Sequence, residues 1–541
     1  MMTAPGMSRR LQEIRERGGK VVLVDPRYNE TARLADRHIF IRPGTDVLLL
    51  LALLHVLFNE KLTQLDHLAS FTKGVETVAQ VAAEFAPERV GPITGIDANQ
   101  IRALAREFAA AESAVCYGRI GLSTQEFGGV CQWLINVLNI VTGNLDRVGG
   151  AMFPLPAFDP ISAPESIAPR GSFNRWQSRV RKLPEFAGEL PVAALAEEIL
   201  TEGTGQVKAL VTLAGNPVLS TPNGRELDRA LASLEFMASI DCYINETTRH
   251  AHIILPPTSP LERGHYDIAF HLLAIHNTAK FSPPLFKPDA ESRHDWEILL
   301  ELETRMKHGG VAGAVKRKLI RQFLTPARMV DLGLRFGPYG ARLNPFSKGL
   351  TLRKVKKAVH GIDLGPLAPC LPARLRTADK QINLAPEAFV SDVQRVQTKF
   401  AEHDLNGHLL LIGRRQLRSN NSWMHNSERL VKGNPAKPQC SILMHPTDAA
   451  NRDLLNGQKA LVRSRVGSIV LPVEVSEEIM PGVVSIPHGW GHDREGNQLE
   501  IARQHPGASI NDLTDQQNID TLCGTAAFNG TAVTVDAYSP D

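Results

Sequence analysis

The chain has 541 residues, of which 43% are hydrophobic and 22% are charged, the usual balance of a globular protein. That length exceeds what one core supports and predicts roughly three or four domains. A formal net charge of only +3 gives no global reason to expect a nucleic-acid or membrane partner. No apolar stretch reaches the roughly 20 residues that cross a bilayer.

Residues 1–150 are expected to form a first unit. From residue 20 to residue 150, β-branched runs alternate with amphipathic stretches, which predicts parallel α/β units. A helix-like run at 9–17 leads directly into the first strand, an order that suggests an earlier strand upstream of this sequence. We expect strands at 21–25, 38–42 and 114–117, and helices at 46–59, 99–111 and 126–141, with Asp97 as an N-cap.

Residues 151–310 begin with a proline-rich crossing or funnel-lining segment, up to about residue 204. A second α/β unit follows, with strands at 206–214, 236–241 and 252–255 and a helix at 225–234. Residues 311–406 are expected to form a basic helical insertion or linker. Between Lys316 and Lys357 there are 12 Lys or Arg and one acid, which indicates either an anion-facing strip or a solvated helical linker.

Residues 407–541 have a different texture, with short strands separated by dense turns. The expected strands lie at 409–412, 440–444, 459–464, 468–475 and 482–486, and turn residues such as Asn456-Gly457 stand between them. This pattern predicts a compact β-barrel with little helix.

The six cysteines are spread singly along the chain, and no two of them form a CxxC pair. A zinc ribbon or a locally held iron–sulfur cluster is therefore not predicted. The scatter suits a reducing compartment, and we expect a cytoplasmic protein.

Several short motifs stand in one order along nearly the whole chain. They are Asp25-Pro26-Arg27 with Glu30-Thr31-Ala32, Pro43-Gly44-Thr45-Asp46, LNIVTGNLDRVGG at 138–150, Gly215-Asn216-Pro217, Glu246-Thr247, Ile254-Leu255-Pro256, Gly413-Arg414-Arg415, Asn421-Ser422, the stretch from His445 to Ala449, and Asn511 with Leu513-Thr514. The ordered set resembles the molybdopterin-dependent oxidoreductases of the dimethyl-sulfoxide-reductase superfamily.

The resemblance implies parallel-sheet, Rossmann-like cofactor-binding units and a C-terminal β-barrel of the double-psi type. It implies a molybdenum or tungsten centre held by bis(molybdopterin guanine dinucleotide), which would oxidise or reduce a small substrate such as formate or nitrate together with a redox partner or electron-transfer subunit. In this family a four-iron, four-sulfur cluster and a metal-ligating Cys, selenocysteine or Ser precede the first strand described here. We therefore expect both in a missing upstream part, no metal ligand in this chain, and no activity from the chain alone.

Carboxylates at strand ends are the first candidate cofactor-binding residues, because α/β sheets bind ligands there. Asp25, beside Arg27, could accept from ribose hydroxyls or guanine N–H groups; the alternative is a helix N-cap. Asp46 follows Gly44 and could likewise be a cap or a cofactor contact. Asp241, at the end of another strand, is the candidate for the second nucleotide.

Small-residue turns are the second group of candidates, since they allow a cofactor to approach the backbone. Gly118, Arg119 and Gly121 follow the strand expected at 114–117, and Arg119 could pair with an anionic substrate or within the fold. Gly215 and Asn216 form the matching turn in the second unit, where an ordinary strand-to-helix turn is the alternative.

A polar loop after the first barrel strand supplies the third group, because guanidinium, hydroxyl and amide groups suit pyrophosphate and pterin edges. Its candidates are Gly413, Arg414, Arg418, Ser419, Asn421, Ser422 and His425. The sequence HGWGH, with His488 and His492, is not expected to bind zinc because its glycines disfavour a helix; a loop near the pterin is expected, with His488 in contact. Asn511 is expected to donate to the second pterin or its phosphate.

Two further hypotheses remain beside a catalytic subunit. One is a non-catalytic electron-transfer or structural subunit on the same scaffold, as in the large subunit of complex I, and the other is a non-redox hydratase on this fold. Retention of the polar loop at 413–426 favours the catalytic subunit. Fold-level kinship does not identify a substrate.

Overall fold

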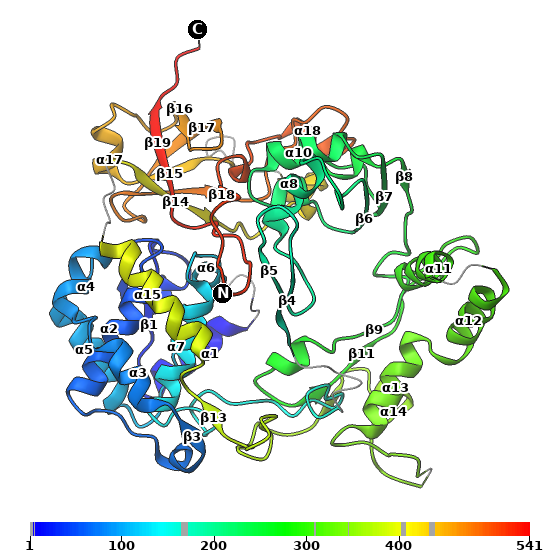
Figure 1. Ribbon diagram of the computed structural model, residues 1–541, viewed down its shortest axis with the longest axis horizontal. Coiled ribbons are helices and arrows are strands. Elements are labelled where there is room, and N and C mark those ends of the chain that lie inside the picture. Colours follow the sequence, from blue (N-terminus) through cyan, green and yellow to red (C-terminus); the bar gives the residue numbers. More distant parts are fainter. Residues whose placement is uncertain are drawn as a thin grey trace.

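The computed structural model describes residues 4, 6–163, 171–307, 310–344, 346–401, 407–431 and 439–540. Parallel α/β units and a closed C-terminal β-barrel are present, so the predicted fold class is confirmed. In Figure 1 the barrel lies above the first α/β unit and the second unit lies beside the barrel. Helices α12 and α13 lie at the right of this view, across from the first unit.

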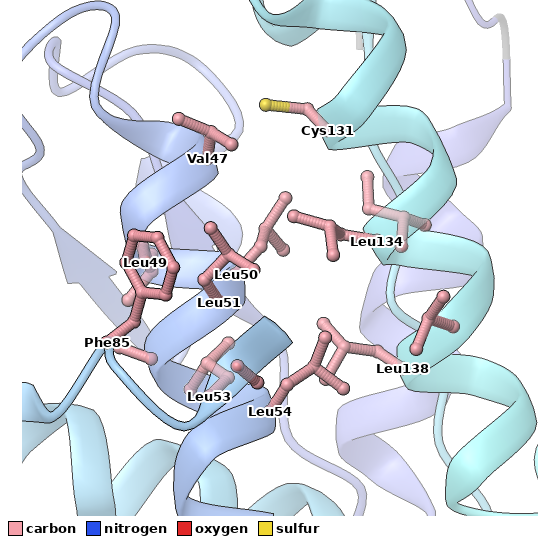
Figure 2. Packing of buried hydrophobic residues seen from close by; sticks show 14 of the residues in the cluster. Val47, Leu49, Leu50, Leu51, Leu53, Leu54, Phe85, Cys131, Leu134 and Leu138 are labelled. Atoms are coloured by element: carbon pink, nitrogen blue, oxygen red, sulfur yellow. The ribbon is translucent and has the colours of Figure 1, made fainter. Parts of the chain in front are cut away.

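The first α/β unit pairs β1 (Val22–Val24) in parallel with β2 (Arg37–Ile39). Its core is the packing of α2 (Asp46–Asn59) against α7 (Gly128–Val141), with α4 (Pro87–Thr94) and α5 (Ala98–Ala110) beside α2. Figure 2 shows leucines of α2 directed at Leu134 and Leu138 of α7. α2 is apolar around most of its circumference because other elements cover it on several sides.

The prediction of a strand at 114–117 in this unit is wrong. The backbone N–H groups of Ala114 and Cys116 are bound by the side-chain carbonyl oxygens of Asn144 and Asn139 rather than by a neighbouring strand. A β-branched run predicts an extended chain, but a strand also needs a backbone partner, and side chains satisfy the donors here. The cap at Asp97 is confirmed, since its carboxylate accepts from two N–H groups of α5.

The second α/β unit is a parallel sheet of β6 (Ala209–Leu213), β7 (Phe236–Ile240) and β8 (Ile253–Ile254), in that order. Helix α10 (Gly224–Ala232) is capped by Asn223 and packs on α8 (Leu195–Leu200).

The basic segment is helical as expected, with α12 (Gly310–Phe323), α13 (Pro326–Phe336) and α14 (Leu352–Lys357) following α11 (Asp295–Lys307). The predicted segment ended at residue 406, but in the structure residues 382–401 pack on the first unit instead. β13 (Ile382–Asn383) pairs with β3 (Thr72–Lys73), and α15 (Glu387–Ala401) packs on α7. An amphipathic pattern predicts a helix but does not say which core it covers. The predicted boundary at 406 lies outside the described residues.

The C-terminal barrel is closed by six strands in the order β14, β18, β15, β17, β16, β19. Their bounds are β14 (Leu409–Arg414), β15 (Ile442–Met444), β16 (Lys459–Arg463), β17 (Ser468–Val475), β18 (Val483–Pro487) and β19 (Thr531–Ala537). The closing strand β19 was not predicted. In the described part of the chain, no helix has the length and apolar character needed to span a membrane.

Candidate functional site

Asp25 follows β1 directly, where the first unit meets the barrel. Its carboxylate accepts from the backbone N–H of Arg27 and from the Asn29 side chain, both at 2.9 Å. The Asn29 side chain accepts from the N–H groups of Thr31 and Ala32, so Asn29 caps that turn, and the alternative of Asp25 as a cap is wrong. Burial raises the pKa of Asp25 to about 6, against the opposing hydrogen bond and charge of Arg27.

The loop after Asp25 runs along the barrel. The N–H of Tyr28 donates to the carbonyl of Glu478, and the N–H of Met480 donates to the carbonyl of Pro26. Arg27 itself lies 3.9 Å from Glu30. Backbone hydrogen bonds therefore join the loop after the first strand to the barrel.

Asp46 begins α2 and lies close enough to Asp25 for its charge to raise the pKa of Asp25. The N-cap position is held by Thr45, so Asp46 is not the cap. Its carboxylate accepts from Gln125 at 2.7 Å, and burial raises its pKa. Gly44 has a φ of 84°, a left-handed conformation that suits glycine at this turn. Two partly desolvated carboxyl groups thus share one edge of the first unit.

The turn at Gly118, Arg119 and Gly121 contacts the barrel through a residue that sequence reasoning missed. The Asn529 side chain donates to the carbonyl of Gly121 at 3.2 Å and accepts from the N–H of Gly413 at 3.2 Å. Two of the predicted glycine turns therefore meet at one amide. Asn529-Gly530 immediately precedes β19, and this turn-forming pair was a usable signal.

The space beside this junction is small. A cavity of about 90 Å³ lies between Gly44, Phe127 and Asn529, among other residues. Nucleotide-sized pockets occupy roughly 300–1,000 Å³, so this cavity does not house a dinucleotide. Arg119 points elsewhere, with its guanidinium donating to the Tyr117 hydroxyl at 3.2 Å, and Gly118 packs closely against Ile135.

Arg414 has a structural role in the barrel. Its guanidinium donates to the carbonyl oxygens of Ser485 and Ser441, which joins β14 to β18 and to the residue that precedes β15. Burial lowers its pKa to about 10. Because those donors are already used, Arg414 is a weaker candidate for pyrophosphate than the sequence suggested.

The rest of the polar loop packs against the HGWGH segment. His488 contacts the Asn421 side-chain oxygen at 3.0 Å, and burial lowers the pKa of His488 to about 4. A side chain at Gly489 would meet the Asn421 carbonyl at 2.1 Å, so glycine is needed for this approach. Ser422 precedes a short 3-10 turn, Ser419 is buried and donates to the Gln416 carbonyl, and Arg418 is exposed.

His425 belongs to a buried chain that joins the barrel to the second unit. Its Nδ1 lies 2.9 Å from Nε2 of His492, and Nδ1 of His492 lies 2.8 Å from the Glu246 carboxylate. Glu246 also accepts from Asn216 at 2.5 Å. Sequence reasoning placed Glu246 only in a motif and did not select His492 as a site residue. Both residues lie in motifs that the sequence showed, the pair Glu246-Thr247 and the segment HGWGH. Their contact could not be predicted because 246 residues separate them.

The two other candidates on the second unit and the barrel are bound by protein groups. Asp241 follows β7, is 8% exposed, and its carboxylate accepts from the N–H groups of Cys242 and Tyr243. The Asn511 amide donates to the carbonyl of Thr221 at 2.8 Å, which fastens the barrel to the second unit. Gly215 has a φ of 77° in the turn after β6. Trp423, in the polar loop, is 58% exposed.

No group of three or more His, Cys, Asp or Glu side chains within the described ranges has an arrangement suited to a metal ion. The six cysteines are free thiols. We assign no metal-ligating side chain among these residues.

Comparison with known proteins identifies the class. The model of the molybdopterin oxidoreductase family matches residues 2–305, and that of the molybdopterin dinucleotide-binding domain matches residues 409–532. Because the first match covers more than half of the chain, the protein belongs to the molybdopterin oxidoreductase family, a family of enzymes. Its barrel is a molybdopterin dinucleotide-binding domain.

Particular relatives sharpen this assignment. The chain is 24% identical over 528 residues to F420-dependent formate dehydrogenase 1 subunit alpha of Methanococcus maripaludis, covering 94% of this chain and 72% of the relative. It is 23% identical over 552 residues to the assimilatory nitrate reductase catalytic subunit of Bacillus subtilis, covering 92% and 70%. Among solved structures, acetylene hydratase from Pelobacter acetylenicus has a TM-score of 0.74 at 20% identity, over 98% of this chain and 75% of that one; this similarity concerns the fold alone.

The described residues fit a molybdopterin nucleotide. Two partly desolvated carboxylates at the edge of the first unit can accept from heterocyclic N–H or ribose O–H groups. Nε2 of His425 is buried and makes no hydrogen bond within the described structure. A buried polar atom of this kind calls for a partner beyond the protein.

Proposed function

We propose that this chain is part of a catalytic subunit that binds a molybdenum or tungsten centre as bis(molybdopterin guanine dinucleotide). When bound, that group supplies two-electron chemistry on a small substrate such as formate or nitrate. The observation that carries the proposal is the polar loop at 413–426, which stands against the dinucleotide-binding barrel with an unsatisfied buried nitrogen. A scaffold without cofactor has no need of that nitrogen.

The protein residues would bind and orient the cofactor. We propose Asp25, Arg27, Gly44 and Asp46 for one nucleotide and Asp241 with Gly215 for the other, while Gly118, Arg119 and Gly121 line the approach to the pterin. The loop contributes Gly413, Arg418, Ser419, Asn421, Ser422 and His425, and His488 supports Asn421. Arg414, Asn216 and Asn511 would act indirectly, because their polar groups bind protein atoms.

A non-catalytic electron-transfer or structural subunit on the same scaffold is the alternative. The proposed protein is cytoplasmic, exchanges electrons with a redox partner or partner subunit, and consists of units at 1–150 and 151–310, a basic segment from 311 and the barrel from 407. The sequence predicted a basic segment at 311–406. We instead assign residues 382–401 to the first unit, because β13 pairs with β3 and α15 packs on α7.

Turnover distinguishes these functions. The protein, purified from a host that makes the cofactor and with its native partner subunits present, is expected to oxidise formate or reduce nitrate with viologen dyes. Asp25→Asn should lower cofactor content and activity together, whereas Asp289→Asn, on an exposed loop, should change neither. Protein that folds normally without metal or pterin would favour the non-catalytic alternative.

A further inference from the structure

Helix α12 is amphipathic, but it packs on the protein with its charged side. Lys316 lies 3.5 Å from Glu303 of α11, and Arg317 lies 3.4 Å from Glu301. Arg321 adds a second ion pair to Glu301 at 3.5 Å. Figure 1 shows α12 at the right edge of the view, next to α11. These ion pairs set the rotation of α12 about its axis, so its opposite side is directed away from α11.

The side of α12 that is directed away from α11 carries an apolar stripe. Val311, Val315, Leu319 and Phe323 recur every four residues, a spacing that keeps them on one side of the helix. Each of these side chains is more than half exposed. A surface helix normally has the reverse arrangement, with its apolar side chains against the core and its charged side chains in water. The stripe is therefore a surface that α12 does not use for its own packing.

The next helix, α13, also presents apolar side chains to solvent. Its exposed apolar residues are Met329, Leu332 and Phe336. Leu334 on the same helix is buried in one hydrophobic cluster with Tyr266 and Leu352, so the packing of α13 does not depend on the exposed residues. The Arg328 guanidinium lies 5.8 Å from the centre of the Phe323 ring, which brings the start of α13 next to the end of the stripe. Neighbouring exposed apolar side chains of this kind mark a site of interaction.

The same part of the chain concentrates positive charge. From Lys316 to Lys357 there are 12 Lys or Arg and one acid, a net charge of +11, whereas the whole chain has +3. The remainder of the chain therefore carries a net charge of −8. Lys318 is exposed beside Val315 on the side of the stripe and forms no ion pair with a described residue. The molecule is thus polarised, and its positive end is the end that exposes the apolar stripe.

This charge distribution distinguishes between the surfaces that could cover the stripe. A second copy of the chain would bring two strongly basic segments together, and their repulsion opposes association. A nucleic acid binds mainly through its phosphates, which leaves an aliphatic stripe unused. An anionic lipid bilayer meets both requirements, because its headgroups attract Lys and Arg while the region below them takes up apolar side chains.

We propose that α12 and the start of α13 dock this protein peripherally on an anionic lipid surface. The stripe from Val311 to Phe323 enters the headgroup region, and Lys318 contacts lipid phosphates. The ion pairs with α11 hold the helix in the orientation that presents the stripe. None of the candidate cofactor-binding residues lies in α12 or α13, so this docking surface goes beyond the proposed function and does not depend on it.

Sedimentation with lipid vesicles measures the docking directly. The purified full chain is mixed with vesicles of phosphatidylcholine alone, or of equal parts phosphatidylcholine and phosphatidylglycerol. We expect binding to the anionic vesicles to be stronger by about tenfold or more and to weaken in high salt, because the headgroup charge attracts the basic segment. Absence of binding to the anionic vesicles, or equal binding to both kinds, would overturn the proposal.

Substitutions on the exposed side of α12 locate the contact. Leu319→Ser removes an apolar side chain and Lys318→Glu reverses a charge, and each should weaken binding to anionic vesicles by about five- to tenfold. Leu455→Ser is the matched control, because Leu455 is a leucine of the barrel that is 74% exposed; its binding should equal that of the wild type. All three side chains are exposed, so the variants should fold normally, which circular dichroism checks. Undiminished binding of both α12 variants, or an equal loss in the control, would contradict the assignment.

Hydrogen exchange identifies what covers the stripe. With anionic vesicles the α12 amides should exchange more slowly than without them, and the α2 amides should not change. Protection of α12 that rises with protein concentration, without a response to vesicles, would show a second copy instead. Protection that appears only with a partner subunit, again without a response to vesicles, would show a protein groove. Either of these results would overturn the proposal.

Discussion

Two helices of 14 residues each, α2 and α12, have opposite relations to the rest of the molecule. α2 buries nearly all of its apolar side chains, and Figure 2 shows several of them facing α7. α12 directs Lys316, Arg317 and Arg321 at Glu301 and Glu303 of α11. Its apolar residues face outward instead, and their exposed fractions are 81% for Val311, 51% for Val315 and Leu319, and 53% for Phe323.

The difference shows which force holds each region. Burial of a leucine side chain stabilises a fold by about 1.5–3 kcal/mol, whereas an exposed ion pair contributes about 0–1 kcal/mol. The first α/β unit should therefore open only with global unfolding, and α12 should detach from α11 at a lower free energy.

Of the substitutions considered, truncation of a core leucine should change the free energy of unfolding most. Leu54→Ala, at a position with 0% exposure, is expected to destabilise the first unit by about 3 kcal/mol because it leaves a cavity. Leu319→Ala on α12 is the matched control and should change stability by less than about 0.5 kcal/mol. Hydrogen exchange of the α2 amides measures the first effect, and hydrogen exchange of the α12 amides measures the second. Equal effects would show that α12 is as tightly packed as α2.

Asp25→Asn tests how much the buried charge of Asp25 destabilises the first α/β unit. Because burial raises the pKa of Asp25 from 3.8 to about 6, the folded state binds more protons between these values, and stability falls as pH rises through this window. Removing the charge should stabilise the cofactor-free protein at pH 7 by about 1–2 kcal/mol after loss of one accepted hydrogen bond, with the gain vanishing below pH 4. Thermal unfolding from pH 4 to 7 measures this. A variant less stable than wild type at pH 7 would contradict the assignment.

Glu301→Gln should have the smallest effect. Glu301 faces Arg305, Arg317 and Arg321, and the hydrogen bond from Arg305 lowers its pKa. Its stabilising contribution is therefore present above its ordinary pKa and is lost as pH falls. We expect faster hydrogen exchange in α12, corresponding to about 0.5–1 kcal/mol, and a similar result for the wild type in 1 M salt. Unchanged exchange in both experiments would mean that these ion pairs do not hold α12.

Local patterns in the sequence predicted much of the fold, but they did not predict which distant segments pair with each other. The apolar run of α2 and the alternation of β17 predicted those elements with their observed bounds. The pattern of α15 could not reveal that it packs on α7, because hydrophobic periodicity gives a face but no partner. Asn529, His492 and Glu246 were missed as site residues for the same reason: their contacts join separate units, whereas the motifs that carry them are short.

The central claim is that this chain binds a molybdopterin guanine dinucleotide centre, and the most direct measurement is the content of purified protein. Metal analysis for molybdenum and tungsten, combined with acid release of nucleotides, is expected to give two guanosine monophosphates for each metal ion, as the bis form requires. Asp25→Asn should lower both in proportion. Fully folded protein from a cofactor-producing host, with its partner subunits present but without metal, pterin or guanine nucleotide, would contradict the account.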